Sequence, residues 1–348
     1  MKALFLVTGR GEGGDAVTAL NISKVLTHHG FESDFALDPR ATGVLFEKNN
    51  IKWHETSIPQ AGGHAATKLS LVKGGFKTLK AVFSTVKLIR KIRPDVVIGV
   101  IGGGAVIACI SSKFAGVPGV GISNTPTDAK VCSNLTATIA LPESSLFTLN
   151  SVNERVYKTY YPVEPKITQG NQEKAVKMMP ANYREDVPTI LLSSGSLLFE
   201  KMALAASKLG KSDINANIVV VGNIRNEKCT KLLKSENVIY LGYVDWMQDL
   251  LQLTDVAVLS DDGMMINEAL ACKLPIVSLV RVKYGRYHNI ASLFDGAVVE
   301  SDLEDIDEVL IDVLNNLKEF KTTAAKYGEE ILKSSEKIAR IIIDQVKK

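Results

Sequence analysis

Residues 260–277 read SDDGMMINEALACKLPIV, a pattern of strand end, glycine turn, short helix and next strand. Gly263 supplies the turn, and Pro275 stands just before the apolar residues of the next strand. Glu268 lies in the first turns of the expected helix, at the edge where the preceding strand ends. This segment is typical of a parallel α/β sheet, which binds ligands at the carboxyl ends of its strands.

The same order of strand, glycine turn and helix recurs along the chain. Ala3–Val7 is an apolar strand, residues 9–14 form a glycine loop, and Asp15–His28 has helical spacing that stops at Gly30. Apolar strands that alternate with helices indicate parallel sheets covered on both faces. Further strands are expected at Asp95–Val100, Val117–Ile122, Thr189–Ser193, Ile218–Val221, Val238–Leu241, Val256–Ser260, Ile276–Leu279 and Ala297–Val299.

The second half of the chain repeats the architecture of the first without repeating its sequence. A tight turn at residues 194–196 should lead from the strand Thr189–Ser193 into a helix over Leu197–Leu209. The polar stretch Lys166–Asp186 has linker character, and a long helical pattern covers residues from about Glu319 to Val346.

Length and composition fit two domains better than one. The chain has 348 residues, 46% hydrophobic and 23% charged, which is ordinary globular usage. We expect an N-terminal domain at 1–163, a second domain at 164–330, and a C-terminal helix at 331–348 that returns to the first domain. Two sheets that face each other would place the ligand site in the cleft between them.

Charge and cysteine usage narrow the class of protein. The net charge of +3 is too mild to indicate nucleic-acid binding. The scattered residues Cys109, Cys132, Cys229 and Cys272 show no metal-like spacing and suit a reducing compartment. The apolar run Ala3–Val7 is too short for a signal peptide, and no run approaches the roughly 20 apolar residues of a spanning helix. We therefore expect a cytoplasmic protein.

Residues 68–93 form a basic segment without an acidic residue. Apolar residues recur in it at helical spacing, so it predicts an amphipathic helix that contacts an anionic membrane surface. A core-packed helix with a solvated basic face is the alternative. The side chains expected at the membrane are Phe76, Leu79, Phe83, Lys73, Lys77 and Lys80.

Three features suggest a nucleotide ligand. The glycines of residues 9–14 let a backbone approach an anion, and residues 194–196 open the second sheet in the same way. The Glu268 carboxylate can accept two hydrogen bonds from a ribose diol. The alternatives are plain turns and a solvated helix glutamate. The adjacent Asp261 and Asp262 side chains should point in different directions, which argues against a metal site.

Five blocks along the chain carry a resemblance: residues 9–14, Arg93–Gly99 with the glycines that follow, Pro162–Val163, Tyr243–Met247 and Ser260–Pro275. In this order they resemble the MurG-like UDP-N-acetylglucosamine transferases of peptidoglycan synthesis, in glycosyltransferase family 28. The block from Ser260 to Pro275 is the most specific of them. The resemblance implies the GT-B fold, with two doubly wound, Rossmann-like domains that face each other across a cleft.

The resemblance also implies roles for single residues. Glu268 corresponds to the ribose-binding glutamate, and Val244 to the residue whose backbone reads uracil. Gly195, Ser196, Gly263 and Met264 correspond to the diphosphate site, and Asn289 to an asparagine after the donor-sugar loop. Apart from the resemblance, Arg286 and Lys283 could offset diphosphate charge, with surface solubility as the alternative role. The acceptor pyrophosphate would meet Gly13, Gly14, Gly102, Gly103 and Gly104. The family needs no metal or cofactor, because the UDP-sugar is a substrate.

Departures from the family leave the donor sugar and the acceptor open. Asp15 stands where the family has a histidine, and the family's GGSQG loop reads Ser194–Leu198 here. A family glutamine is replaced around Gly285-Arg286, and the family's HEQN block reads Ile122–Thr125. Asp15 is our first candidate for the catalytic base, with a helix N-cap as its alternative role, and Asp128 is the second.

The resulting hypothesis is an inverting, metal-independent glycosyltransferase. It would move N-acetylglucosamine from a UDP-sugar to a lipid-linked cell-envelope precursor, such as a peptidoglycan or pseudomurein intermediate, at the inner face of the cell membrane. One alternative is a UDP-sugar 2-epimerase, and another is a non-catalytic or partner-dependent subunit that binds UDP-sugar. An NAD-dependent dehydrogenase, with Asp34 or Asp38 at the ribose, would explain the first glycine loop but not the second sheet with Glu268.

Overall fold

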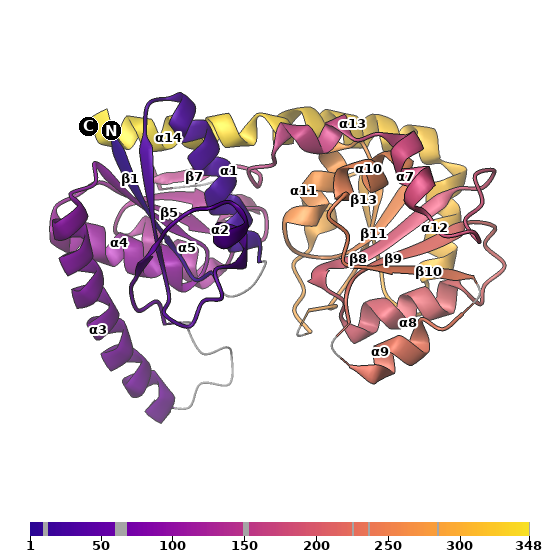
Figure 1. The fold of residues 1–348 in the computed structure, drawn as a ribbon, viewed down its shortest axis with the longest axis horizontal. Coiled ribbons are helices and arrows are strands. Elements are labelled where there is room, and N and C mark those ends of the chain that lie inside the picture. The colour runs from indigo at the N-terminus through magenta and orange to yellow at the C-terminus, as the bar shows by residue number, and fades with distance from the viewer. Residues whose placement is uncertain are drawn as a thin grey trace. The chain divides into compact units, whose positions relative to one another are not determined.

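The computed structural model describes residues 1–9, 13–59, 68–148, 153–224, 226–235, 237–283 and 285–347, and for residues 68–76 it describes the backbone alone. The chain divides into two compact units, which Figure 1 shows. Unit 1 comprises Met1–Pro162 and Lys333–Lys348, and unit 2 comprises Val163–Leu332. Each unit has a parallel sheet of its own, so we describe each separately.

The described residues of unit 1 form a seven-stranded parallel sheet in the order β3-β2-β1-β4-β5-β6-β7. Buried apolar side chains fill β1 and β4, which explains why these strands lie at its centre. The strands are β1 (Lys2–Val7), β2 (Glu32–Leu37), β3 (His54–Glu55), β4 (Val96–Val100), β5 (Gly119–Ser123), β6 (Ala137–Ala140) and β7 (Val156–Lys158). The helices are α1 (Gly14–His28), α2 (Val44–Lys48), α3 (Lys68–Ile92), α4 (Gly103–Ala115), α5 (Pro126–Ser133), α6 (Ser145–Thr148) and α14 (Ser334–Lys347).

In unit 2 the described strands form a six-stranded parallel sheet in the order β10-β9-β8-β11-β12-β13. The strands are β8 (Thr189–Leu197), β9 (Asn217–Asn223), β10 (Val238–Gly242), β11 (Val256–Ser260), β12 (Ile276–Leu279) and β13 (Val298–Ser301). The helices are η1 (Pro165–Gln169), α7 (Gln172–Met178), α8 (Glu200–Leu209), α9 (Glu227–Leu232), α10 (Met247–Leu253), α11 (Met264–Ala271), η2 (Ile290–Leu293), α12 (Ile306–Asn315) and α13 (Leu317–Leu332).

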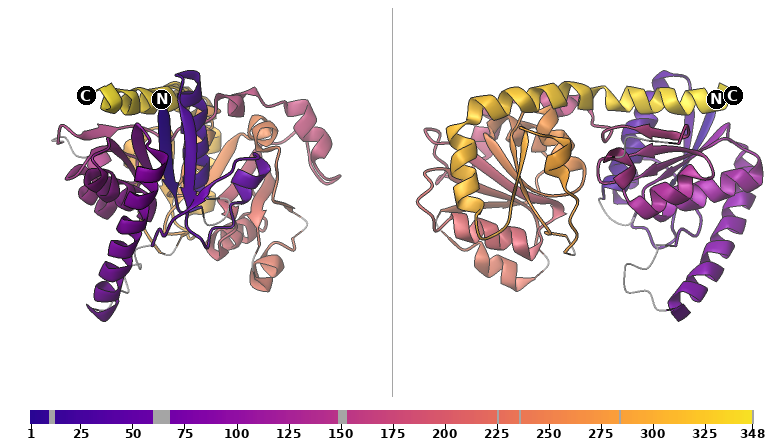
Figure 2. Two further views of the ribbon diagram at one scale, coloured as in Figure 1. Left: turned by 60° about the vertical axis from the view of Figure 1, so that its left-hand side comes forward. Right: turned by 180° about the vertical axis from the view of Figure 1, so that it is seen from behind.

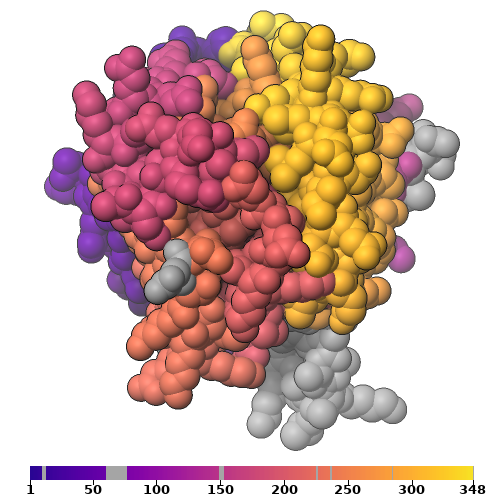
Figure 3. All heavy atoms as spheres, turned by 90° about the vertical axis from the view of Figure 1, so that its right-hand side faces the viewer, coloured from indigo at the N-terminus to yellow at the C-terminus, as the bar shows by residue number. Residues whose placement is uncertain are grey.

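Helices cover both faces of each sheet, as Figure 2 shows from two further directions. Figure 3 shows one face of unit 2, where the yellow C-terminal helices cover a broad part of the surface beside the pink segment that contains α7. Across the described ranges, no helix combines the length and apolar character needed to cross a membrane.

Three local expectations were wrong. Residues 194–196 form no separate turn, because β8 continues to Leu197 through a register shift and α8 begins only at Glu200. The stretch expected as a linker contains η1 and α7, because buried Asp249 on α10 accepts the Asn171 amide at 2.8 Å and pairs with Lys174 at 2.8 Å. The long C-terminal helix is two helices, α13 and α14, and the boundary between the units falls between them.

Candidate functional site

The first six strands of the unit 1 sheet follow the same order as the six strands of unit 2, so each sheet has a corresponding point where that order reverses. In unit 1 the reversal lies between β1 and β4, and in unit 2 between β8 and β11. Ligands of doubly wound sheets bind at such points, beyond the carboxyl ends of the strands. The glycine-containing segments that the sequence analysis singled out lie at the carboxyl ends of these four strands: residues 194–196 within the end of β8, and the others after β1, β4 and β11.

The candidate site of unit 2 lies at the carboxyl ends of its strands β8 and β11, which we call the unit 2 edge. A bulge held by two serines forms the first half of this edge. The Ser193 hydroxyl accepts the Gly195 amide at 3.1 Å, and the Ser194 hydroxyl donates to the Leu197 carbonyl at 2.9 Å. Gly195 takes a φ of +96°, a conformation that side chains other than glycine rarely adopt. Ser196 is partly exposed next to it. The segment keeps the predicted diphosphate residues Gly195 and Ser196 at the strand end, although as a bulge and not as a helix start.

Helix α11 forms the other half of this edge and carries Glu268. Gly263 is its N-cap with a φ of +97°, so the amides of the first turn, including that of Met264, lack intrahelical partners. The Met264 side chain is buried, which leaves only its backbone for a ligand. The Glu268 carboxyl has no hydrogen-bond partner among the described residues, and burial raises its pKa to about 7. An ionised, unpartnered carboxylate in this setting gains most from a pair of hydroxyl donors.

Val244 and Asn289 lie in loops that follow strands of the same sheet. Val244 is partly exposed and follows Gly242, the end of β10, whose φ is +69°. Asn289 is exposed at the start of η2, and its side-chain oxygen lies 3.2 Å from the Tyr287 hydroxyl. The Arg286 side chain is also exposed, and its amide donates to the Lys283 carbonyl at 3.2 Å.

The carboxylates of Asp261 and Asp262 have separate partners. Asp261 is 1% exposed and accepts the His288 amide at 3.1 Å. Asp262 pairs with the Lys283 ammonium at 2.7 Å. Sequence reasoning considered these residues only as metal ligands and missed their contacts with the loop after β12, since adjacent acidic residues give no signal of distant backbone partners.

In unit 1, Asp15 stabilises the turn between β1 and α1. Its carboxylate accepts the Thr8 hydroxyl and, at 3.1 Å, the Gly9 amide. Its other oxygen accepts the Ala16 amide at 2.9 Å. Gly13, and not Asp15, is the N-cap of α1, so the alternative role as an N-cap was wrong. Asp15 is partly exposed at the carboxyl end of β1, and residues 10–12 of the glycine loop lie outside the described residues.

The five glycines expected at the acceptor differ in the space around them. A Cβ at Gly103 would lie 2.3 Å from the Pro59 carbonyl oxygen, and one at Gly104 would lie 2.7 Å from that of Leu6, so both let α4 pack closely on its neighbours. A Cβ at Gly13 would lie 2.8 Å from the Asp15 carboxylate. At Gly14 and Gly102 it would meet no atom within 4 Å. The open positions for an anion are therefore the starts of α1 and α4.

Two other carboxylates of unit 1, those of Asp128 and Asp38, form hydrogen bonds that stabilise the fold. Asp128 accepts the Thr125 hydroxyl at 2.6 Å, and that hydroxyl accepts the Asp128 amide at 3.3 Å, which is a reciprocal cap of α5. Asp38, at the end of β2, is 2% exposed. Burial opposes its ionisation, but hydrogen bonds from the Arg40 side chain and the Ile58 amide outweigh it and lower its pKa to about 2. Asp38 therefore offers no free carboxylate to a ribose, against the dehydrogenase alternative.

Helix α3 presents an exposed face that is both apolar and basic. Leu79 is 57% exposed and Phe83 is 75% exposed, four residues apart, with Lys77 and Lys80 exposed beside them. Its inner face packs through Ala81, Val82, Val86 and Ile89. Val86 thus belongs to the core and not to the exposed face. The side chains of Lys73 and Phe76 lie outside the described residues.

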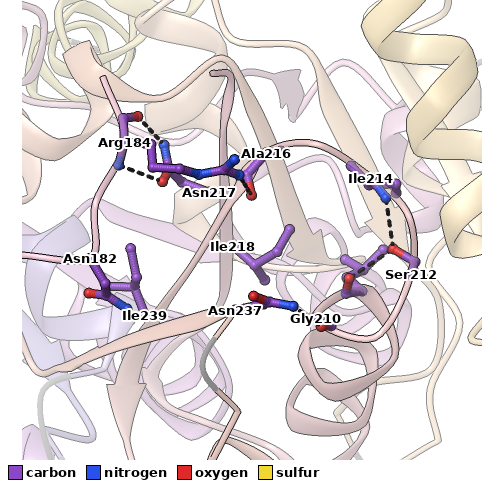
Figure 4. Close-up of a pocket in the computed structure, with 11 residues that line it drawn as sticks. Asn182, Arg184, Gly210, Ser212, Ile214, Ala216, Asn217, Ile218, Asn237 and Ile239 are labelled. Carbon is purple, nitrogen blue, oxygen red and sulfur yellow. Dashed lines mark hydrogen bonds between the residues drawn. The ribbon is translucent and has the colours of Figure 1, made fainter. Parts of the chain in front are cut away.

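A pocket of about 170 Å³ lies at the opposite edge of the unit 2 sheet, near the amino ends of β9 and β10 (Figure 4). Its polar side chains bond to the fold. The Asn217 side chain accepts the Arg184 amide and donates to the Arg184 carbonyl. The Asn237 side chain donates to the Gly210 carbonyl at 2.9 Å. This pocket contains none of the predicted site residues.

Comparisons with known proteins agree with the sequence blocks. A family model described as glycosyl transferases group 1 matches residues 195–316. A relative from Leuconostoc citreum is 25% identical over 341 residues, 88% of this chain and 89% of that protein. A Clostridium tetani relative is 25% identical over 253 residues, 69% of this chain and 62% of that protein. Both are named UDP-N-acetylglucosamine--N-acetylmuramyl-(pentapeptide) pyrophosphoryl-undecaprenol N-acetylglucosamine transferase.

Solved structures give the same fold. MurG of Acinetobacter baumannii has a TM-score of 0.67 with 17% identity, and the match covers 99% of each chain. HepE of Anabaena, in complex with UDP and glucose, has a TM-score of 0.68 with 16% identity, covering 100% of this chain and 99% of that one. The solved structures confirm the GT-B fold, and the family model and the curated relatives confirm the resemblance to MurG-like glycosyltransferases.

Proposed function

We propose that this chain transfers N-acetylglucosamine from UDP-N-acetylglucosamine to a lipid-linked cell-envelope precursor. The observation that carries the proposal is Glu268, whose carboxyl has no hydrogen-bond partner among the described residues and lies one helix turn beyond the Gly263 N-cap. It falls inside the segment matched by the glycosyltransferase model. The named activity of the curated relatives supplies the donor and the class of acceptor.

The edge of unit 2 offers one group for each part of the donor. Glu268 would accept the ribose hydroxyls, and the backbone at Val244 would read the uracil. The bulge at Gly195-Ser196 and the first-turn amides of α11 would receive the diphosphate, whose charge helix N-termini and loop amides stabilise. Departing UDP would be stabilised in the same way, without a metal ion. The exposed Asn289 and Arg286 would meet the sugar and the diphosphate.

Unit 1 would hold the acceptor through the open helix starts at Gly14 and Gly102. Direct attack of the acceptor hydroxyl inverts the sugar configuration and needs a base to take the hydroxyl proton. Asp15 lies beside the first of these helix starts. Asp128 is the weaker candidate, because its carboxylate already accepts the Thr125 hydroxyl inside the cap of α5.

The exposed face of α3 would bring the enzyme to its lipid-linked substrate. Leu79 and Phe83 would enter the boundary between headgroups and acyl chains, while Lys77 and Lys80 contact anionic lipid. This arrangement would place the protein at the inner face of the cell membrane, where anionic lipids are abundant.

The test is UDP release from UDP-N-acetylglucosamine in the presence of EDTA, with and without a lipid-linked acceptor. We expect release that depends on the acceptor and is unchanged by added magnesium. Interconversion of the sugar at C2 without acceptor would instead support the epimerase. Binding of UDP-sugar without turnover on any lipid-linked acceptor would support the non-catalytic subunit.

A further inference from the structure

The loop after β12, residues 281–289, is held in an unusual backbone conformation. Arg281 and Asn289, one at each end, have φ values of +54° and +47° although neither is glycine. Such conformations persist only where the surrounding structure holds them, and they gather at ligand sites. Tyr284 lies outside the described residues.

Several contacts fix this loop to the ends of the neighbouring strands. The Tyr287 hydroxyl lies 3.0 Å from a Glu300 carboxylate oxygen on β13. Within the loop itself, the Arg281 guanidinium lies 5.4 Å from the centre of the Tyr287 ring. Lys283 reaches Asp262 at 2.7 Å, beside the start of α11. The side chains in these contacts are partly or fully exposed, so contacts with water can replace them at little cost in free energy.

The contact of Asp261 with the His288 amide differs because it is buried. Only 1% of the Asp261 surface is exposed, so solvent does not stabilise its carboxylate. A buried carboxylate must be compensated by hydrogen bonds, and the backbone amides of His288, at 3.1 Å, and of Arg281 supply them. Because Asp261 follows β11 directly, it joins the loop to the strand that leads into α11.

We propose that Asp261 is a positioning residue for donor-sugar recognition, which fixes the loop 281–289 by accepting the His288 amide. The inference rests on the proposed function of the unit 2 edge. Asp261 is too buried to touch the sugar, so it acts through the exposed side chains of the loop. Its removal should weaken the contacts of the sugar and leave those of uridine and diphosphate in place.

Two substitutions separate the hydrogen bond from the charge. Asp261→Asn keeps the shape and an acceptor oxygen, whereas Asp261→Ala removes both. We expect Asp261→Ala to weaken UDP-N-acetylglucosamine binding about 10-fold while UDP binding changes less than about 2-fold, since loss of a supporting contact misplaces only what it supports. Asp261→Asn and the control Asp213→Ala, an exposed carboxylate of the same unit, should bind both ligands like the wild type.

Calorimetry with these variants decides between the outcomes. An equal loss for UDP and UDP-N-acetylglucosamine, or an Asn variant as weak as the Ala variant, would overturn the positioning role. Wild-type protein that binds neither ligand would overturn the proposed function and, with it, the link to the donor sugar.

A second measurement needs no ligand and tests the anchor by itself. Hydrogen exchange of the unliganded full chain should show faster exchange at the His288 amide in Asp261→Ala and wild-type exchange in Asp261→Asn. Unchanged exchange in Asp261→Ala would show that the loop does not depend on this bond, and would overturn the inference even if the donor binds.

Discussion

The two units place similar glycine motifs at corresponding points of their two sheets, but Glu268 of unit 2 differs from the carboxylates singled out in unit 1. In unit 1, Asp15, Asp38 and Asp128 all accept hydrogen bonds from neighbouring backbone or hydroxyl groups. In unit 2, Glu268 has no such partner among the described residues, and burial raises its pKa. Glycine turns therefore mark both edges, but a carboxylate without a hydrogen-bond partner among the described residues distinguishes the edge that we propose for the nucleotide.

The largest expected effect is a loss of turnover when Asp15 of unit 1 is changed. Asp15→Asn should reduce turnover by about 10²–10⁴-fold and leave UDP binding unchanged, if Asp15 takes the acceptor proton. The Asn side chain can still accept the Gly9 amide, so thermal unfolding serves as the control for the turn. Wild-type turnover in this variant would assign Asp15 to the turn alone.

The matching change in unit 2 is Glu268→Ala. Two charge-assisted hydrogen bonds to the ribose, about 1.5–3 kcal/mol each, would be lost, so UDP affinity should fall by about 10²-fold or more. Calorimetry measures it, with Asp128→Asn as the control that leaves UDP affinity unchanged. If both variants bound UDP equally well, the contrast between the edges would have no functional meaning.

A pH titration tests the same carboxylate without a mutation. Its pKa is raised to about 7 by burial, and the ionised form accepts the ribose bonds. Affinity for UDP-N-acetylglucosamine should therefore rise between pH 6 and pH 8, by about 10-fold from the protonated to the ionised form. The sugar nucleotide is the better probe, because a terminal phosphate itself titrates near pH 6. Glu268→Gln should flatten the profile, and a profile of equal slope in that variant would assign the titration to another group.

A rise in pH should change the folding stability in the opposite direction to the ligand affinity. The folded-state pKa of Glu268 exceeds its ordinary value, so the folded protein holds this proton more tightly than the unfolded chain does. Unliganded wild type should lose stability relative to Glu268→Gln as pH rises toward about 7, and the difference should level off above it. Denaturant unfolding at several pH values measures this difference.

The smallest expected effect concerns the membrane. Lys80→Glu on the exposed face of α3 changes the local charge by two, and each nearby positive charge contributes about 1 kcal/mol on an anionic surface. Flotation with anionic liposomes should show weaker binding for this variant, and Lys211→Glu, an exposed lysine of unit 2, serves as the control. Equal flotation of both variants and the wild type would leave α3 without a membrane role.

Sequence patterns predicted the fold because they depend on local periodicity. The helix stop at Gly30, the apolar strands and the glycine turn before α11 all follow from short-range signals. The bulge at 194–197 and the helix α7 were missed because they depend on distant partners, such as Asn223 for Leu198 and Asp249 for Asn171. The same limit applies to the site, since no sequence pattern shows that Asp15 accepts hydrogen bonds while Glu268 has no partner in the described part of the chain.

The most direct test of the account is a binding cycle between one ligand hydroxyl and one side chain. UDP and 2′-deoxy-UDP are titrated into wild type and Glu268→Ala by calorimetry. We expect wild type to prefer UDP by about 10-fold, as for one charge-assisted hydrogen bond, and the variant to show no preference. A variant that keeps the full preference for UDP would show that Glu268 does not hold the ribose, and would contradict the assignment of the nucleotide to this edge of unit 2.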